Sequence, residues 1–207
     1  MSTAGHIELL RHGRTLNEGV FRGRLDEPLS DEGHAQMAAS VDGHRWSRVI
    51  ASPLSRCRRF GAHLARERGI ELAVDERLAE YDFGEWEGRT IQSVMESEGD
   101  SVQRFFADPY AFTPPGGENF RRFNERVLGA WRDLSGNIPG SAVETGDNIL
   151  VITHGGVILS ILASVLDREG LHMRIDVPHA CISRIARAWE DRPQRLLFHG
   201  VGPIRDT

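Results

Sequence analysis

Two apolar runs that each end in a histidine followed by glycine constrain this chain more than any other feature. Residues 7–10 lead into Arg11-His12-Gly13, and residues 149–152 lead into Thr153-His154-Gly155-Gly156. Charged groups at the rim of a core lose hydration unless other groups compensate. Ligand crevices of open α/β sheets form at the carboxyl ends of the strands. The pattern therefore predicts two buried strands whose ends meet in one site, built from both ends of the chain.

The order of the expected elements places these strands in an α/β fold. Strand-like and helical segments alternate with short links, which implies right-handed parallel crossovers and helices on both faces of the sheet. We expect a three-layer α/β/α sandwich with a mostly parallel sheet. The expected strands span residues 7–10, 49–51, 71–74, 148–153, 182–189 and 195–199, the last two at a sheet edge. The expected helices span residues 31–41, 54–68, 118–134 and 157–166.

Local signals mark the ends of two of these helices. Ser30 stands before two acidic residues, as an N-cap does at the positive end of a helix. Ser52-Pro53 has the signature of an N-cap followed by proline at the first helical position, and Gly69 ends the same helix.

Residues 76–117 break the alternation with clustered aromatic residues, prolines and glycines. We expect this segment to form a small cap inserted over the C-terminal ends of the strands, within a single domain of residues 1–207. Within it, at least one of Glu85 and Glu87 is expected to pair with a nearby arginine.

Composition excludes several classes of protein. The net charge of −5 argues against a general nucleic-acid or membrane-surface binder. The chain has no apolar run of about 20 residues, and its first residues lack a signal-peptide pattern, so we expect a cytoplasmic protein. Cys57 and Cys181 stand in apolar settings typical of buried free thiols.

The chain has 25 basic residues, and all of them are arginines. Genomic base composition accounts for this bias, yet it means that an anion site must use arginine, histidine and backbone N–H groups. Arg11 adjoins His12, and Arg56 falls in the first turn of an expected helix, where anions are favoured. The guanidinium fork matches phosphate oxygens. These residues predict a pocket for a dianionic phosphoryl group.

For His12 alone the residues leave four roles open: nucleophile, metal ligand, general base or packed core residue. A metal site is disfavoured, because no H-x-x-x-H or H-E-x-x-H spacing occurs and adjacent arginines would repel a cation. We therefore expect neither a metal nor another cofactor.

Four motifs in order resemble the histidine phosphatase (phosphoglycerate mutase-like) superfamily. They are Leu10-Arg11-His12-Gly13, Ser52-Pro53-Leu54-Ser55-Arg56-Cys57, the segment from Leu78-Ala79-Glu80 to Phe83-Gly84-Glu85-Trp86-Glu87-Gly88, and Thr153-His154-Gly155-Gly156. The resemblance implies that His12 attacks phosphorus and becomes phosphohistidine, and that Glu80 protonates the leaving oxygen. It implies phosphoryl or substrate contacts from Arg11, Asn17, Arg24, Arg56, His154 and Gly155. His179 is a minor candidate for the same site.

The substrate implied by the resemblance is a small phosphorylated metabolite. Residues 52–58 and 108–120 are similar to the α-ribazole-5′-phosphate phosphatases of cobalamin assembly, although Asn119 stands where serine is common. A broad-specificity metabolite phosphatase or phosphoglycerate mutase-like enzyme is the alternative, and a phosphate-binding pseudoenzyme is the non-enzyme alternative. An exposed late edge strand is compatible with a homodimer.

Overall fold

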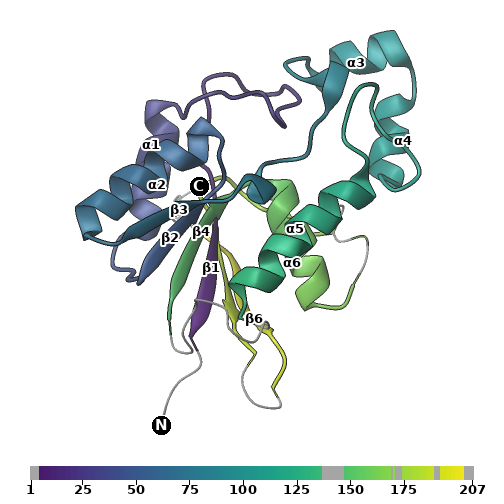
Figure 1. Ribbon diagram of the computed structural model, residues 1–207. Coiled ribbons are helices and arrows are strands. Elements are labelled where there is room, and N and C mark those ends of the chain that lie inside the picture. Colours follow the sequence, from purple (N-terminus) through teal and green to yellow (C-terminus); the bar gives the residue numbers. More distant parts are fainter. Residues whose placement is uncertain (1–4, 137–146, 169, 171–173, 189–191, 203–207) are drawn as a thin grey trace.

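A six-stranded sheet in the order β3-β2-β4-β1-β5-β6 organises the molecule (Figure 1). The computed structural model describes residues 5–136, 147–168, 170, 174–188 and 192–202. The strands are β1 (His6–Arg11), β2 (Arg48–Ala51), β3 (Glu71–Val74), β4 (Ile149–Thr153), β5 (Ile182–Ala186) and β6 (Arg195–Val201). The α-helices are α1 (Asp31–Val41), α2 (Ser55–Arg68), α3 (Ile91–Glu98), α4 (Ser101–Ala107), α5 (Phe120–Leu134) and α6 (Gly155–Val165).

The sheet is mostly parallel, which confirms the expected fold class. Strands β3, β2, β4 and β1 pair in parallel, and β5 and β6 add antiparallel strands at the edge beside β1. All five residues of β4 are buried, because β4 lies between two other strands and is covered on both faces. Such a strand reads as an unbroken apolar run, which is why residues 149–152 were recognisable in the sequence.

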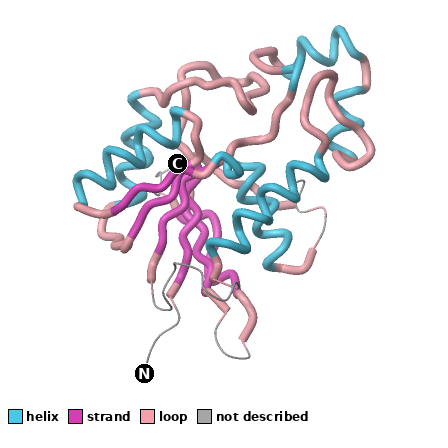
Figure 2. The backbone as a smooth tube through the Cα atoms, in the orientation of Figure 1, coloured by secondary structure: helices cyan, strands magenta, loops and turns pink. Residues whose placement is uncertain are grey.

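Helices cover both faces of this sheet. Figures 1 and 2 show α1 and α2 on one face and α5 and α6 on the other. Alternate strand residues point to opposite faces, so Leu150 and Ile152 pack with α1 and α2, while Ile149 and Val151 pack with α5 and α6.

Two helices begin at positions other than those expected. Helix α2 starts at Ser55, whose amide donates to the Asp26 carboxylate at 2.6 Å. Ser52 therefore does not cap this helix. Helix α6 starts at Gly155, two residues early, although glycine is a poor helix former. The other expected helices and strands agree with the structure to within a few residues, where the chain is described.

The segment between β3 and α5 forms the expected cap. It holds two 3₁₀ turns (Glu76–Leu78 and Gly84–Trp86) and helices α3 and α4, which extend beyond the sheet on the side of α5 (Figure 1). Phe21, from the loop between β1 and α1, packs against Phe83 and Trp86 of the cap. The cap and this loop are therefore joined above the strand ends. The polar loop expected before Asp147 lies outside the described residues, as does Trp189.

Across the described part of the chain, no helix is long and apolar enough to cross a membrane. Both cysteines are buried and free, as expected.

Candidate active site

The register of two central strands brings the two histidine motifs together. Arg11 of β1 pairs with Thr153 of β4, so the next residues, His12 and His154, leave the sheet side by side. The His12 amide donates to the Thr153 carbonyl at 3.0 Å, and the two imidazole centroids lie 5.2 Å apart. His12 is 5 % exposed and His154 is fully buried. The two histidine motifs therefore meet in one place, as predicted.

His12 is arranged as a neutral base. Its Nδ1 lies 2.8 Å from the Gly13 carbonyl oxygen, which can only accept a hydrogen bond, so Nδ1 carries the proton and Nε2 keeps its lone pair. Burial lowers the pKa of His12 well below its usual value, and the positive charges of Arg56 and Arg11 lower it further. At neutral pH this leaves an unprotonated Nε2, the atom that a nucleophile needs.

The glycine after His12 is required by close packing. A Cβ atom on Gly13 would lie 2.1 Å from the Gly33 carbonyl oxygen of α1. The close approach of this loop to α1 therefore requires glycine at position 13.

Two arginines flank the histidine pair. Arg11 donates to the Val177 carbonyl, and its second terminal nitrogen lies 3.0 Å from His179 Nε2. Arg56 is fully buried and donates to the carbonyls of Gly23 at 2.7 Å and Leu25 at 2.9 Å. Loop 23–25 is thus tied to Arg56 through its carbonyl groups.

His154 is held by partners on both ring nitrogens. Arg56 Nε donates to His154 Nδ1 at 3.3 Å, so Nε2 carries the proton and donates to Ser52 Oγ at 2.7 Å. Burial lowers the pKa of His154 well below its usual value, followed by the charge of Arg56. Ser52 is therefore part of this cluster, and its hydroxyl oxygen also accepts from the Leu54 amide just before α2 at 3.3 Å.

Glu80 is fixed by two backbone amides at the edge of the cluster. Its carboxylate accepts from the Tyr81 amide and from the Gly156 amide, each at 3.0 Å. A Cβ atom on Gly156 would lie only 2.5 Å from Glu80 Oε1. The negative charge of Glu80 raises the pKa of Arg11 and of Arg56, partly offsetting burial, which lowers both. Five predicted residues are thereby gathered in one place: Arg11, His12, Arg56, Glu80 and His154.

Gly155 lies beside them, at the N-terminal end of α6. A Cβ atom at this position would lie 3.6 Å from Arg11 Nε, an ordinary contact distance. The N-terminus of α6 therefore faces the arginine cluster, an arrangement that favours an anion.

The predicted residues of the loop after His12 form an outer group. The Asn17 side-chain amide donates to Glu27, and Glu27 pairs with Arg22 at 2.6 Å. Arg24 is held through its backbone amide by Glu87, and its side chain makes no hydrogen bond or ion pair with described residues. Burial lowers the pKa of Arg11 and Arg56, and the positive charge of Arg22 lowers both further.

The site includes two residues that the sequence did not identify clearly. His179 was only a minor candidate; it contacts Arg11, and its ring centroid lies 5.6 Å from that of His12. Burial and the charge of Arg11 lower the pKa of His179 to about 4. Glu87 accepts from the backbone amides of residues 23, 24, 25 and 83. Among the described residues, neither Glu85 nor Glu87 forms an ion pair with an arginine, so that expectation was wrong.

Two buried arginine N–H groups lack an acceptor. Arg11 Nε and Arg22 Nη2 are shielded from solvent and have no hydrogen bond partner among the described residues, although Arg22 also forms an ion pair with Glu27. A buried donor without an acceptor is unfavourable, so an anion that accepts from Arg11 Nε would stabilise the pocket. In the same part of the chain, no group of three or more His, Cys, Asp or Glu side chains is placed to hold a metal ion.

Comparison with known proteins gives a family. The family model described as "Histidine phosphatase superfamily (branch 1)" matches residues 7–198. A putative phosphoserine phosphatase 2 of Hydrogenobacter thermophilus is 30% identical over 161 residues, which cover 75% of this chain and 76% of that protein. An adenosylcobalamin/alpha-ribazole phosphatase of Escherichia coli is 26% identical over 176 residues, 81% of this chain and 84% of that protein.

A solved structure described as a putative alpha-ribazole-5′-P phosphatase from Escherichia coli superposes with a TM-score of 0.81 and 25% identity, covering 96% of this chain and 97% of that one. Some relatives are longer: the chain spans 52% of a bifunctional protein of Mycobacterium tuberculosis, to which it is 30% identical over 91% of its own length.

Proposed function

The chain belongs to the histidine phosphatase superfamily, and from that premise we propose that it hydrolyses a small phosphomonoester through a phosphohistidine on His12. One observation carries the proposal most directly. Nε2 of His12 is left unprotonated, and the neighbouring Arg11 has a buried Nε–H group without an acceptor among the described residues. A dianionic phosphoryl group supplies this acceptor and places phosphorus beside the nucleophile.

The first step transfers the phosphoryl group to the enzyme. His12 Nε2 forms a bond to phosphorus, the bond from phosphorus to the ester oxygen breaks, and the carboxylic acid form of Glu80 gives its proton to the leaving oxygen. Arg11, Arg56 and the N-terminus of α6 stabilise the charge on the equatorial oxygens. The products are an alcohol and phosphohistidine.

The second step releases phosphate. The Glu80 carboxylate takes a proton from water as the water oxygen attacks phosphorus, and the bond between phosphorus and Nε2 breaks. Phosphate leaves, and His12 and Glu80 return to their starting protonation states. Covalent catalysis divides a barrier that requires accelerations of up to about 10²¹-fold for phosphate monoesters into two lower ones.

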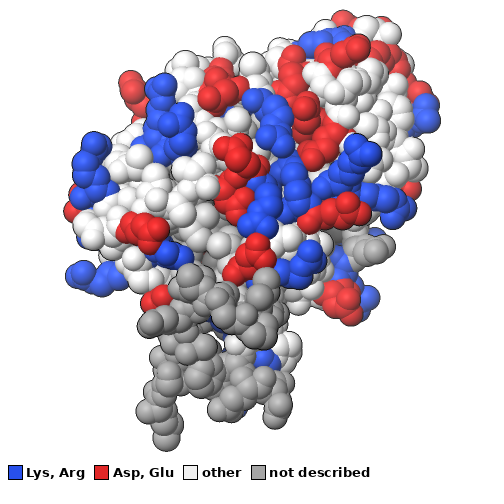
Figure 3. Space-filling view, in the orientation of Figure 1, with Lys and Arg blue, Asp and Glu red and all other residues white. Residues whose placement is uncertain are grey.

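For the substrate we propose α-ribazole 5′-phosphate. Supporting this are the similarity to relatives named for that substrate and the turn before α5, where Asn119 accepts from the Arg121 amide at 3.0 Å. Asparagine caps a helix as well as serine does, so the departure at position 119 keeps the local structure. The alternative is a broad-specificity metabolite phosphatase. It is supported by the similarity to a relative named as a putative phosphoserine phosphatase. Basic and acidic side chains are interspersed on the face seen in Figure 3, which suits a small metabolite better than a polyanion.

The purified protein in EDTA is expected to hydrolyse p-nitrophenyl phosphate, and His12→Ala is expected to remove that activity while leaving the circular dichroism spectrum unchanged. An acid-labile phosphoryl group on His12, seen by rapid-quench mass spectrometry, identifies the intermediate. Activity retained in His12→Ala would overturn the assignment of the nucleophile. A screen with α-ribazole 5′-phosphate, 3-phosphoglycerate, phosphoserine and sugar phosphates then separates the two substrate proposals.

A further inference from the structure

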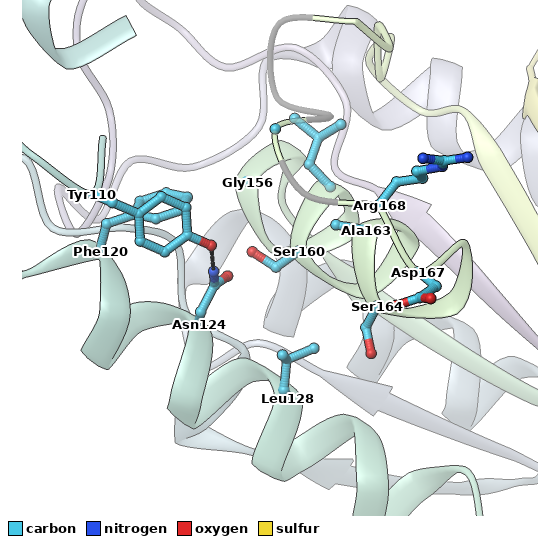
Figure 4. Close-up of a pocket in the computed structure, with 12 residues that line it drawn as sticks. Tyr110, Phe120, Asn124, Leu128, Gly156, Ser160, Ala163, Ser164, Asp167 and Arg168 are labelled. Atoms are coloured by element: carbon cyan, nitrogen blue, oxygen red, sulfur yellow. Dashed lines mark hydrogen bonds between the residues drawn. The ribbon is translucent and has the colours of Figure 1, made fainter. Parts of the chain in front are cut away.

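Two neighbouring cavities lie near Glu80. The smaller, of about 150 Å³, is lined by Glu80 and by aromatic side chains that include Tyr81, Phe83 and Phe123. The larger, of about 310 Å³, lies between α5 and α6 (Figure 4). Phe120, Gly156 and Leu159 line both cavities, which are therefore neighbours, and we refer to the two together as the α5–α6 groove.

This groove begins where the leaving group must lie. Glu80 lines one end, and Gly156, whose amide holds the Glu80 carboxylate, lies at the junction of the two cavities. From Gly156 to Ser164 the groove follows α6 for about 12 Å at 1.5 Å per residue. An alcohol whose oxygen is within reach of Glu80 can therefore extend along α6.

The lining of the groove combines aromatic surface with unpaired polar atoms. The Tyr81 hydroxyl is buried without a partner among the described residues, and so is the Asn124 Oδ1 atom. The other end of the Asn124 amide donates to the Tyr110 hydroxyl at 2.5 Å. In Figure 4 the Asn124 and Ser160 side chains extend into the space between the helices. A hydroxyl group on a ligand can pair with either kind of atom, as donor or acceptor.

The charges in the groove disfavour a short acidic alcohol. A carboxylate two or three bonds from the ester oxygen would lie beside Glu80 and the aromatic rings, where the smaller cavity has no cation in its lining. The only cation lining the larger cavity, among described residues, is Arg168 at its far end, next to Asp167.

We propose that the α5–α6 groove is the subsite for the leaving group, and that it takes the monophosphate of a neutral, ring-bearing alcohol with free hydroxyl groups, such as a nucleoside. The ring lies against the apolar wall at Phe120 and Leu159, and a hydroxyl pairs with Asn124. This inference rests on the proposed phosphatase activity and adds to it the residues that bind the leaving group.

The test compares kcat/KM for two ring-bearing esters, α-ribazole 5′-phosphate and adenosine 5′-monophosphate, with that for ethyl phosphate, which cannot enter the groove. In the wild type at least one ring-bearing ester is expected to exceed ethyl phosphate by about 10- to 100-fold, the effect of burying a ring. The ratio is expected to fall about tenfold in Asn124→Leu, which removes the unpaired acceptor. Tyr81→Phe keeps the aromatic wall and is expected to lower the ratio by a few fold.

Glu125→Leu is the matched control, since it changes the neighbouring, exposed residue of α5 and is expected to keep both rates. Thermal unfolding checks that each variant is folded, and Tyr81→Phe carries the test if Asn124→Leu is not. A wild type that hydrolyses none of these esters would contradict the phosphatase proposal itself. A wild type that hydrolyses them all with ratios near one, or folded variants that keep the wild-type ratio, would overturn the subsite and leave the phosphatase proposal standing.

Discussion

At the scale of single residues, the hydrogen bonds of the site leave one nitrogen of His12 and one nitrogen of Arg11 available. Gly13 occupies Nδ1 of His12 and so exposes Nε2, and His179 occupies one terminal nitrogen of Arg11 while Arg11 Nε stays unpaired. The orientation of Arg11 therefore depends on His179, which does not reach the phosphoryl position in the proposed mechanism.

Replacement of His179 by alanine leaves a buried guanidinium nitrogen without its acceptor, which is unfavourable by about 1–3 kcal/mol. We expect kcat/KM for p-nitrophenyl phosphate to fall about 10- to 100-fold, with inorganic phosphate binding more weakly as a product inhibitor. His63→Ala is the control, because that side chain is 55% exposed and pairs only with Glu67 in the described structure. Equal kinetics in both variants would show that His179 does not position Arg11.

Adjacent glycines of α6 offer a sharper comparison. In Gly156→Ala the new methyl group meets Glu80 Oε1 at 2.5 Å, so the carboxylate must move, whereas in Gly155→Ala the nearest atom is 3.6 Å away. General acid catalysis contributes about 10²–10⁴-fold. We expect kcat to fall about 100-fold in Gly156→Ala and only a few fold in Gly155→Ala, measured with a poor leaving group such as ethyl phosphate. Similar kcat values in the two variants would argue against Glu80 as the proton donor.

At the scale of elements, the Glu87 carboxylate of the cap and the Arg56 guanidinium of the phosphoryl pocket hold the same loop, residues 23–25. Glu87 accepts backbone N–H groups of loop 23–25, and the carbonyls of the same loop accept from Arg56. The loop thus lies between a cap residue and a pocket residue, with its donors turned one way and its acceptors the other. Displacement of the cap would be transmitted to Arg56 through this loop.

Glu87→Gln replaces a charged acceptor of four N–H groups with a neutral one that has a single acceptor oxygen. We expect the free energy of unfolding to fall by about 1–3 kcal/mol and KM to rise about tenfold. Chemical denaturation and steady-state kinetics measure the two effects. Glu85→Gln, at an exposed position two residues earlier, should change neither; a loss of stability without a change in KM would separate the loop from Arg56.

The elements that could be predicted from the sequence are those whose signal is local. Strand β4 is an apolar run, α1 has its own capping serine, and Gly69 ends α2 in a left-handed conformation with φ of 65°. The start of α2 was predicted to within one residue, but the acceptor for its Ser55 amide was not, because it comes from Asp26, 29 residues earlier. Similarly, the start of α6 was predicted two residues late. The contacts of Gly155 with Arg11 and of Gly156 with Glu80 are tertiary, so no local signal places these glycines in the helix.

The same division holds for the site. Arg11, His12, Arg56, Glu80 and His154 stand in recognisable motifs, so they could be assigned from the sequence through the family resemblance. His179 and Asn124 belong to no motif and are brought to the pocket and the groove by packing, whereas Tyr81 lies inside the motif around Glu80 but carried no signal of its own. A histidine preceded by a proline and followed by an apolar segment, at residues 178–182, is the only local signal for His179.

At the scale of the whole molecule, the buried histidines make folding sensitive to acid. The unfolded chain binds protons on these histidines near pH 6.5, while burial and neighbouring arginines lower the pKa of His12 and His154 in the folded protein. The contribution of His12 and His154 to the free energy of unfolding is therefore complete above pH 6.5. It is lost as the pH falls below 6.5, by about 1.4 kcal/mol per pH unit for each of the two.

Thermal unfolding at pH 7.5 and pH 5.5 measures this dependence. We expect the wild type to lose more stability over this interval than His12→Asn, which lacks one of the buried titrating groups. His63→Asn, at an exposed position, is expected to keep the wild-type dependence. If His12→Asn keeps it as well, then His12 is not held neutral by the fold.

The position of β1 has a consequence for how the protein is made. Strand β1 pairs only with β4 and β5, which begin at residues 149 and 182. While residues 12–148 are being translated, β1 therefore has both edges unpaired, a state prone to association with other chains. His154, the neighbour of His12 across the sheet, is translated 142 residues after His12, so no partial chain that ends before β4 can form the pocket.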